Sequence, residues 1–431
     1  MKIIENPTRD SWAELIKRPV QRYESIEATI KLIFKEVAVK GDATIRKYTN
    51  LFDGVVLEDL AVSEAEIEEA IQQVPADLKA AIEQAKSNIE RFHKKQNIIP
   101  ISLETMPGVT CWMEKKPIQK VGLYIPGGTA PLFSTVLMLA IPAQLAGCNE
   151  IVLCSPPDKS GKINPAILYA AHSCGITTII KSGGIQAIAG MTFGTETIPK
   201  VYKIFGPGNQ FVTGAKQIAT QFGVAIDMPA GPSELLVFAD TTANVAFVAA
   251  DLLSQAEHGK DSQVVLVSPS KSVLQKVIRE IPSQLADLPR KEIAAEAIRN
   301  ARFIYLKTET EALDFINEYA PEHFMICAAN EDLFIKGISN AGSVFVGNYS
   351  PESAGDYASG TNHTLPTNGY ARNYSGVTLD SFQKMVSFQK LTPEGIRAIG
   401  NSVAVMAAAE GLEAHKNAVT IRLKKLQDEI N

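Results

Sequence analysis

Short apolar runs alternate with helical stretches through most of this chain. One series of runs comprises Val121–Ile125, Glu150–Cys154, Thr177–Lys181, Tyr202–Phe205 and Val224–Met228. A second series comprises Glu234–Ala239, Gln263–Ser268, Arg302–Leu306, His323–Cys327 and Ser343–Val346. Such alternation is typical of βαβ units and of a mostly parallel sheet. We therefore expect two α/β lobes, with ligands at the carboxyl ends of the strands and in a cleft between the lobes.

Helical periodicity marks two segments outside these series. The segment Ser63–Lys95 carries apolar residues at helical spacing with one break at Pro75. The segment Thr392–Gln427 is again helical in pattern, and Gly411 divides it into two pieces. These patterns predict a helical lead-in and a small helical unit near the C-terminus.

The segment Gly347–Tyr374 shows neither a helical nor an alternating period and is rich in Gly, Ser, Asn and Pro. A loop of this length inside a compact domain is usually functional or disordered. Asp356, His363 and Tyr374 within it have side chains suited to chemistry, so we expect a functional loop.

Composition restricts the class of protein. A chain of 431 residues has room for about two to four domains. Hydrophobic residues make up 45% and charged residues 21%, as in a soluble globular protein. The formal net charge of −5 offers no basic surface for nucleic acid. Met1–Arg9 has no signal-peptide core, and Pro142 and Gln144 interrupt the most apolar stretch, so no membrane segment and a cytoplasmic location are expected.

The cysteines favour structural thiols over a redox or metal role. They are scattered and never form a CxxC pair: Cys111, Cys148, Cys154, Cys174 and Cys327. An odd number without paired spacing suggests neither a disulfide framework nor a thiolate zinc site. We expect reduced, mostly buried thiols.

The histidines include candidates for metal binding. Gln255 and His258 are three residues apart, which on a helix would project both side chains from one face. Asp356 and His415 could complete a shell of nitrogen and oxygen ligands. Spacing alone does not select this set, because Asp356 could be a turn residue and His415 a helix-start residue. His93 and His172 are expected to be surface or packing residues.

Glu322 and His323 stand together where a helix meets a predicted strand. An adjacent carboxylate and imidazole can act as a general base and a proton shuttle, since the unperturbed histidine pKa is about 6.5. A surface pair at a helix end is the alternative.

Glycine-rich turns follow predicted strands of the first series: Tyr124–Gly128, Lys181–Gln186, Phe205–Asn209 and Pro229–Ser233. Main-chain N–H groups at strand-to-helix turns can approach a pyrophosphate closely. None of the turns is a GxGxxG, and glycine at such a turn is often turn chemistry only. A nucleotide ligand is therefore an interpretation that these turns permit.

Together these segments resemble the histidinol dehydrogenase family, from about Ser25 to Leu426. The similar stretches occur in the family's order and include VGLYIPGGTAPLFSTVLMLAIPAQLAGC, IFGPGNQFVTGAK, DMPAGPSELLV, LLSQAEHG, APEHF, SAGDYASGTNHTLPT and AAAEGLEAHKNAV. The resemblance implies an enzyme that uses zinc and NAD to oxidise L-histidinol through its aldehyde to L-histidine, at the end of histidine biosynthesis.

The resemblance also implies roles for particular residues. Glu322 and His323 would be the catalytic acid/base pair. The zinc ligands would be Gln255, His258, Asp356 and His415. The histidinol site would be lined by Ser233, Gln255, His258, His323, Asp356, His363, Glu410 and His415. NAD would contact Tyr124, Gln186 and Asn209.

The family's architecture implies a homodimer with two incomplete Rossmann-like lobes and small terminal segments exchanged between subunits, so that Glu410 and His415 would reach the partner's site. The predicted boundaries are residues 1–22 for an N-terminal helical arm and 378–431 for a C-terminal helical segment. A discontinuous first lobe would comprise 23–122 and 234–377. The second, NAD-binding lobe would comprise 123–233.

The expected mechanism has His323 take the hydroxyl proton and Glu322 activate water for oxidation of the aldehyde, with two NAD reduced per turnover. A cysteine nucleophile, Cys111 or Cys148, is a competing route. A zinc hydrolase and a non-catalytic α/β ligand-binding module are the alternatives from other classes.

Overall fold

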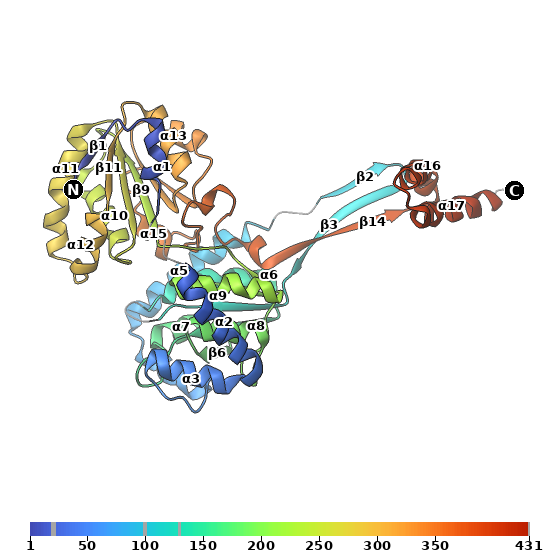
Figure 1. Ribbon diagram of the computed structural model, residues 1–431, viewed down its shortest axis with the longest axis horizontal. Helices are drawn as coiled ribbons and strands as arrows, with labels where there is room; N and C mark the ends of the chain where they lie inside the picture. The colour runs from blue at the N-terminus through green and yellow to red at the C-terminus, as the bar shows by residue number, and fades with distance from the viewer. Residues whose placement is uncertain (19–22, 98–100, 128–130, 430–431) are drawn as a thin grey trace. The chain divides into compact units, whose positions relative to one another are not determined.

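The structure is a computed structural model that describes residues 1–18, 23–97, 101–127 and 131–429. The chain divides into two compact units (Figure 1). The first unit contains Met1–Gln96 and Ile118–Phe382, and the second contains Asn97–Pro117 and Gln383–Asn431. Each unit is built around its own sheets.

One lobe of the first unit is a parallel sheet formed by the first predicted series of strands. Its strands are β4 Lys120–Tyr124, β5 Glu150–Ser155, β6 Thr178–Lys181, β7 Lys203–Phe205 and β8 Ala225–Ile226. They lie in the order β6-β5-β4-β7-β8, and every pair is parallel. We call this the second lobe, as in the sequence analysis.

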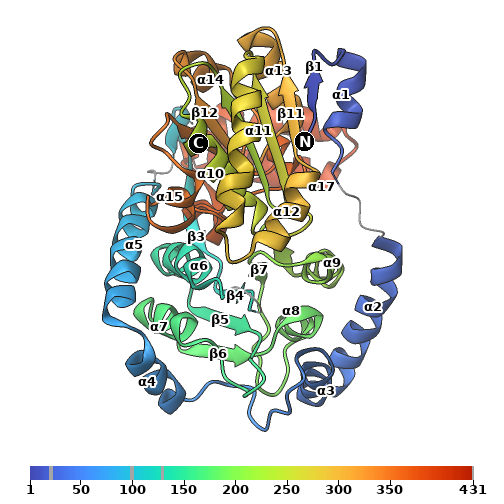
Figure 2. The same cartoon turned by 90° about the vertical axis from the view of Figure 1, so that its left-hand side faces the viewer.

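Helices cover both faces of this sheet (Figure 2). On one face lie α4 Glu64–Gln73, α5 Ala76–Lys94, α6 Phe133–Ala146 and α7 Pro165–Ser173. On the other lie α2 Tyr23–Lys40, α3 Asp42–Asp53, α8 Gly184–Phe193 and α9 Gln210–Ala219. Along β4, Val121 and Leu123 enter the first cluster of apolar side chains, and Tyr124 enters the second. Burial on both faces explains why these strands are continuous apolar runs.

The domain boundaries differ from the prediction that grouped residues 23–122 with 234–377. Helices α2 to α5 pack on the sheet of the second lobe, because their apolar faces join its two core clusters. The break at Pro75 is where predicted, since it separates α4 from α5.

The first lobe is a second parallel sheet. Its strands are β1 Ile3–Glu5, β9 Glu234–Ala239, β10 Gln263–Ser268, β11 Arg302–Tyr305, β12 His323–Cys327 and β13 Ser343–Val346, in the order β1-β11-β10-β9-β12-β13. Helices α10 Val245–Ala256, α11 Lys271–Ala286 and α12 Lys291–Arg299 cover one face. The other face is covered by α1 Arg9–Leu15, α13 Glu309–Tyr319 and α14 Glu331–Gly337.

Both lobes share one topology. Counted along the chain from β4 and from β9, the strands of each lobe lie in the order 3-2-1-4-5. This is the Rossmann order without its sixth strand. The prediction of two incomplete Rossmann-like lobes with mostly parallel sheets is confirmed.

The N-terminal segment, which was predicted to be a helical arm, contains the strand β1 as well as α1 in the part described, and its exchange between subunits stays a prediction. β1 pairs in parallel with β11 of the same chain. The Trp12 side chain of α1 is buried, with its ring centroid 5.2 Å from that of Phe315. These contacts hold the segment on the first lobe. Residues 19–22 of the predicted arm lie outside the described residues.

The predicted loop Gly347–Tyr374 contains a short helix, α15 Glu352–Tyr357, and a 3₁₀ turn, η2 Tyr370–Arg372. A helix of six residues is too short to show a hydrophobic period. Tyr374 is exposed and lies edge-on to Tyr370. A further turn, η3 Leu379–Phe382, ends the first unit.

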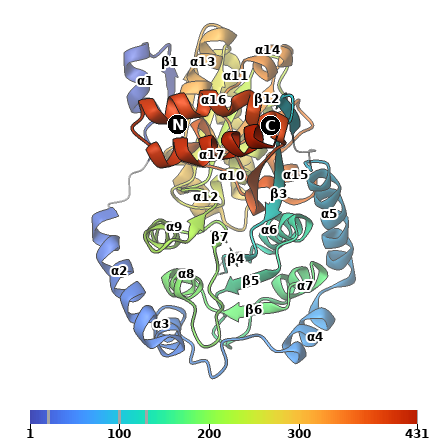
Figure 3. The same cartoon turned by 90° about the vertical axis from the view of Figure 1, so that its right-hand side faces the viewer.

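The second unit combines an antiparallel sheet with two helices. The strands are β2 Ser102–Met106, β3 Val109–Pro117 and β14 Gln383–Leu391, with β3 between the others. Helices α16 Pro393–Ala409 and α17 Glu413–Asp428 pack side by side (Figure 3). The helices and their break at Gly411 were predicted, whereas the sheet was not. In the described part of the chain, no helix is long and apolar enough to cross a bilayer.

Candidate active site

Glu322 and His323 are held by the main chain of one neighbouring residue. His323 begins β12, and Glu234 begins β9, the strand beside it. The main-chain N–H of Glu234 donates to Oε2 of Glu322 at 2.8 Å. Nδ1 of His323 lies 3.0 Å from the main-chain oxygen of Glu234. Both side chains are buried, so the β9–β12 pair fixes their directions.

This location corrects the expectation that ligands lie at the carboxyl ends of all strands. His323 is at the amino end of β12, and Ser233 immediately precedes the amino end of β9. Gln255 lies in the last turn of α10, which returns to that same end of the sheet after β9. In the second lobe the predicted cofactor residues do lie near carboxyl ends of strands, since Tyr124 ends β4 and Asn209 follows β7.

The hydrogen bond to Glu234 determines which ring nitrogen of His323 carries a hydrogen. A carbonyl oxygen only accepts, so Nδ1 carries the hydrogen and Nε2 keeps its lone pair. Among the residues described, none forms a hydrogen bond with Nε2, and Oδ1 of Asp356 is 3.7 Å away. Burial lowers the pKa of His323, against the opposing effect of Asp356. The imidazole is therefore a neutral proton acceptor with a free nitrogen.

Glu322 has the opposite shift. Burial raises its pKa well above the usual range of a glutamate, and the charges of Glu234 and Asp356 act in the same direction. The hydrogen bond from the main chain of Glu234 opposes the shift without reversing it. A carboxyl group with a raised pKa is a stronger base once ionised than an exposed glutamate.

Glu352 is a site residue that the sequence analysis missed. Its side chain in α15 is fully buried, and Oε1 lies 3.4 Å from Nδ1 of His323. Neither carboxyl oxygen has a hydrogen-bond partner among the described residues. Burial raises the pKa of Glu352 well above its usual range, with Asp356 and Glu322 contributing. Proline followed by glutamate at 351–352 is a helix-start signal that could have marked this position.

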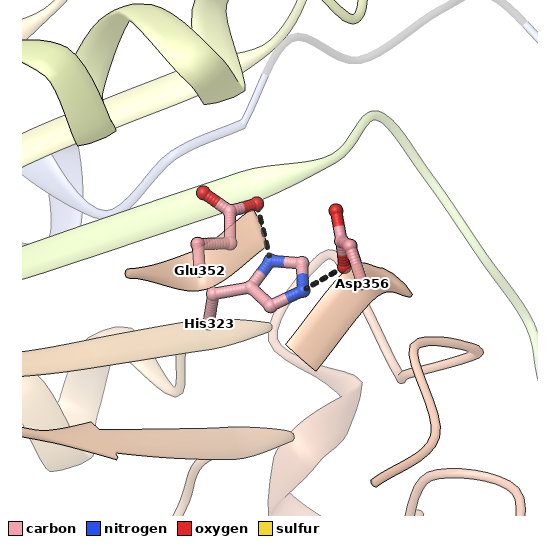
Figure 4. A group of neighbouring side chains, drawn as sticks. All are labelled: His323, Glu352 and Asp356. Atoms are coloured by element: carbon pink, nitrogen blue, oxygen red, sulfur yellow. Dashed lines mark ion pairs between the residues drawn. The ribbon is translucent and has the colours of Figure 1, made fainter. Parts of the chain in front are cut away.

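Figure 4 shows Glu352 and Asp356 pointing toward the two nitrogens of the His323 ring. One ligating atom from each residue lies within 4.8 Å of the others. This trio could hold a metal ion, but it shares only Asp356 with the predicted ligand set.

The predicted ligands of the first unit differ in exposure. Gln255 is fully buried, and neither atom of its amide has a partner within the described ranges. A buried amide without a partner is costly, and an oxygen-binding cation would satisfy it. α10 ends at Ala256, so His258 lies beyond the helix and is exposed, unlike the helical pair that was predicted. α10 packs on α15, which carries Asp356. The donor set therefore suits zinc.

Glu410 and His415 belong to the second unit. Glu410 caps the C-terminus of α16, and His415 lies in the first turn of α17. Both are exposed. The first unit thus supplies Gln255, His258 and Asp356 of the predicted ligand set.

His363 joins the two lobes. Its Nδ1 lies 2.8 Å from the main-chain oxygen of Asp356, and its Nε2 lies 3.0 Å from Oγ1 of Thr135 in α6. The preceding residue, Asn362, donates to the main-chain oxygen of Met138 and contacts Nε2 of His93 at 3.3 Å. His93 is fully buried, so it is a packing residue.

A pocket of about 600 Å³ opens between the lobes of the first unit, and His258 is one of the residues that line it. Asn209, Gln210 and Thr213 of the second lobe line the pocket. Ser233 and His258, which come later in the chain, line it as well. Asn209 caps α9, because its side chain accepts from the main-chain N–H groups of the first turn. The pocket brings together Asn209, Ser233 and His258.

Tyr124 and Gln186 are placed differently from Asn209. Tyr124 is buried, its hydroxyl accepts from the N–H of Gly184 at 3.2 Å, and burial raises its pKa to about 12. Gln186 is also buried, and its amide oxygen has no partner in the part of the chain that is described. Neither residue lines the pocket. Gly128, in the predicted turn after β4, lies outside the described residues.

The family model of histidinol dehydrogenase matches residues 16–423 of the chain. The chain belongs to the histidinol dehydrogenase family. Members of the family are oxidoreductases, and this chain is an enzyme of that class. The zinc hydrolase and the non-catalytic binding module are therefore wrong as alternatives.

Relatives and a solved structure extend this result over the whole chain. A histidinol dehydrogenase of Bacteroides thetaiotaomicron is 56% identical over 427 residues, covering 99% of this chain and 100% of the relative. One of Shigella dysenteriae is 49% identical over 98% of this chain and 97% of its own length. The crystal structure of histidinol dehydrogenase from Elizabethkingia anophelis has a TM-score of 0.97 and 57% identity, covering 99% of both chains.

The surroundings of Cys148 argue against a cysteine nucleophile in this family member. The thiol is buried, donates to the main-chain oxygen of Phe382 at 3.8 Å, and has its pKa raised to about 12 by burial. The reactive thiolate is therefore scarce at neutral pH. Cys111 lies in β3 of the second unit.

We expect Cys148→Ala to retain dehydrogenase activity within about threefold of the unsubstituted protein, because a thiol with such a pKa cannot attack an aldehyde at neutral pH. Steady-state rates with histidinol and NAD, measured beside a thermal unfolding scan, check this. A folded variant with rates at background would restore the route that uses a cysteine nucleophile.

Proposed function

We propose that this protein catalyses the four-electron oxidation of L-histidinol through L-histidinaldehyde to L-histidine, with zinc and two NAD, as the final steps of histidine biosynthesis. The support is the family match over the whole chain together with the geometry at His323. A buried imidazole with one nitrogen committed to a carbonyl and the other free is suited to repeated proton removal.

His323 acts as the base in the oxidation of the alcohol. The free Nε2 accepts the hydroxyl proton as the carbon–hydrogen bond breaks, and the Nδ1–H bond to Glu234 stabilises the ring in the tautomer this needs. The lowered pKa keeps the ring neutral before the step and lets it release the proton afterwards. When bound, NAD supplies the acceptor for the two hydrides.

Glu322 acts on water in the oxidation of the aldehyde. Its ionised carboxyl group takes a proton from a water molecule as the water adds to the aldehyde carbon, and the aldehyde oxygen receives the proton that His323 took in the first oxidation, giving the hydrated aldehyde. Burial excludes other water from the pair and raises the basicity of the carboxylate. The hydrated aldehyde then loses its second hydride with His323 again as base.

The proposed metal ligands are Gln255, His258, Asp356 and, from the partner subunit of a homodimer, His415. When bound, zinc supplies a Lewis acid that orients the imidazole and amino nitrogens of histidinol. The unsatisfied amide of Gln255 supports this set. Ser233, His323, His363 and the partner's Glu410 complete the substrate site.

The proposed NAD contacts are Tyr124, Gln186 and Asn209. Support comes from the position of Asn209 in the pocket and at the N-terminus of α9, where main-chain N–H groups favour an anion. Tyr124 ends β4, and Gln186 lies in the first turn of α8, just after the carboxyl end of β6 in the same sheet. A cytoplasmic location remains a prediction.

Product stoichiometry and metal removal test the overall reaction. We expect two NADH for each histidine formed, with the rate falling at least about tenfold after chelation and returning on addition of zinc. Absorbance of NADH and chromatography of histidine give the count. Formation of one NADH, or undiminished activity in protein verified to be metal-free, would contradict the proposal.

Substitution separates the two half-reactions. His323→Asn should slow oxidation of both histidinol and histidinaldehyde by about 10²-fold or more, because the proton acceptor is lost. Glu322→Gln should spare histidinol oxidation relative to histidinaldehyde oxidation, since only the second needs water. Single-turnover NADH formation from each substrate measures this, and equal losses in both would refute the division of roles.

Mixing of two inactive variants tests the shared site. In a heterodimer of His323→Asn and His415→Ala protomers, one site carries both defects and the other carries neither. Random mixing after reversible dissociation should therefore restore about a quarter of the unsubstituted activity. Each variant mixed with itself is the control. No recovery, with heterodimers demonstrated by mass, would place His415 in the site of its own chain.

A further inference from the structure

The side chain of Glu234 has no place in the proposed chemistry, yet its main chain holds both catalytic side chains. Its N–H binds Glu322 and its carbonyl oxygen binds His323. A shift of the main chain at this one residue would move both groups. The question is what fixes Glu234.

Arg18 grips the carboxylate of Glu234 in the interior of the protein. Nε of Arg18 donates to Oε1 at 2.9 Å, and Nη2 donates to Oε2 at 2.9 Å. The Arg18 side chain is 7% exposed and that of Glu234 is 0% exposed. The main-chain N–H of Asn368 donates to Oε1 as well, at 2.7 Å. A two-pronged contact of this kind fixes direction as well as charge.

The same guanidinium also contacts the end of α13, the helix that precedes Glu322 and His323. Nη2 of Arg18 donates to the main-chain oxygen of Tyr319 at 2.7 Å, and its carbon lies 3.8 Å from the centre of the Tyr319 ring. Tyr319 is the last residue of α13, shortly before Glu322. Arg18 therefore connects the start of β9 to the segment that enters β12.

We propose that Arg18 is a positioning residue for the oxidation: by fixing Glu234 and the end of α13, it sets the directions of Glu322 and of the free nitrogen of His323. This inference rests on the proposed function. A lysine has one compact charge in place of the planar fork, so it would keep the ion pair without the two parallel hydrogen bonds.

A purely structural role for Arg18 is the alternative, because an unpaired buried carboxylate destabilises a fold. Arg302 provides the matched control. Its Nη2 donates to the main-chain oxygen of Lys17 at 2.8 Å, so it anchors the residue next to Arg18. Its Nη1 donates to the side-chain oxygen of Gln263 at 3.5 Å, and within the described residues no hydrogen bond joins it to Glu234 or Tyr319, although the charges of both act on it.

The experiment compares Arg18→Met, Arg18→Lys and Arg302→Met in the full-length protein with bound zinc. We expect Arg18→Met to lower kcat by about 10²-fold with KM for histidinol and NAD within about threefold, because reacting groups are misdirected while binding surfaces persist. Arg18→Lys should recover only part of kcat. Arg302→Met should lower the unfolding midpoint while kcat stays within about twofold.

Two results would overturn the inference: Arg18→Met with unchanged kcat, or losses of kcat in Arg18→Met and Arg302→Met that simply follow their losses of stability. Should Arg18→Met fail to fold, Arg18→Lys decides, since unchanged kcat and KM there exclude a need for the fork. Glu322→Gln and His323→Asn are assayed alongside. If those two remain fully active the proposed function fails, whereas if they are impaired and the Arg18 variants are not, only this inference fails.

Discussion

The parallel pairing of β9 with β12 is the constraint on which the candidate site depends. The register places His323 opposite Leu235, so the main chain of Glu234 meets both Glu322 and His323. A slip of one residue would turn the alternate side chains to the opposite face and separate these partners. Apolar side chains on both faces of the two strands oppose such a slip, because each alternate residue already belongs to one of two packed clusters.

The sequence predicts the strands of the two lobes well because helices cover both faces of each sheet, so that most residues of a strand are apolar and buried on one face or the other. Val121 and Tyr124 enter different clusters of one lobe, and Leu235 and Leu236 enter different clusters of the other. The antiparallel strands of the second unit were not predicted because they lack two covered faces and therefore lack continuous apolar runs. β2 is exposed throughout, and β3 includes charged residues such as Glu114 and Lys116, so neither shows a buried run.

The site was less predictable from single residues than from the family resemblance. Spacing pointed weakly to Gln255 and His258, and the helix ends between them, so their relation depends on a turn that no period describes. Glu352 lay hidden in a segment that seemed irregular, although burial and the contact with His323 make it part of the centre. The end of the sheet at which the site lies also depends on where a helix such as α10 brings its last residues after a strand. The apolar pattern of the strands does not contain that information.

The two hydrogen bonds of the His363 ring have a mechanical consequence. One reaches Thr135 in a helix of the second lobe, and the other reaches the main chain of Asp356 in α15, which packs on the first. If the lobes part, the ring must release one partner or be carried with the other. Any separation of the two lobes would therefore require a local rearrangement at Asp356 or at Thr135, because the imidazole forms hydrogen bonds to both sides.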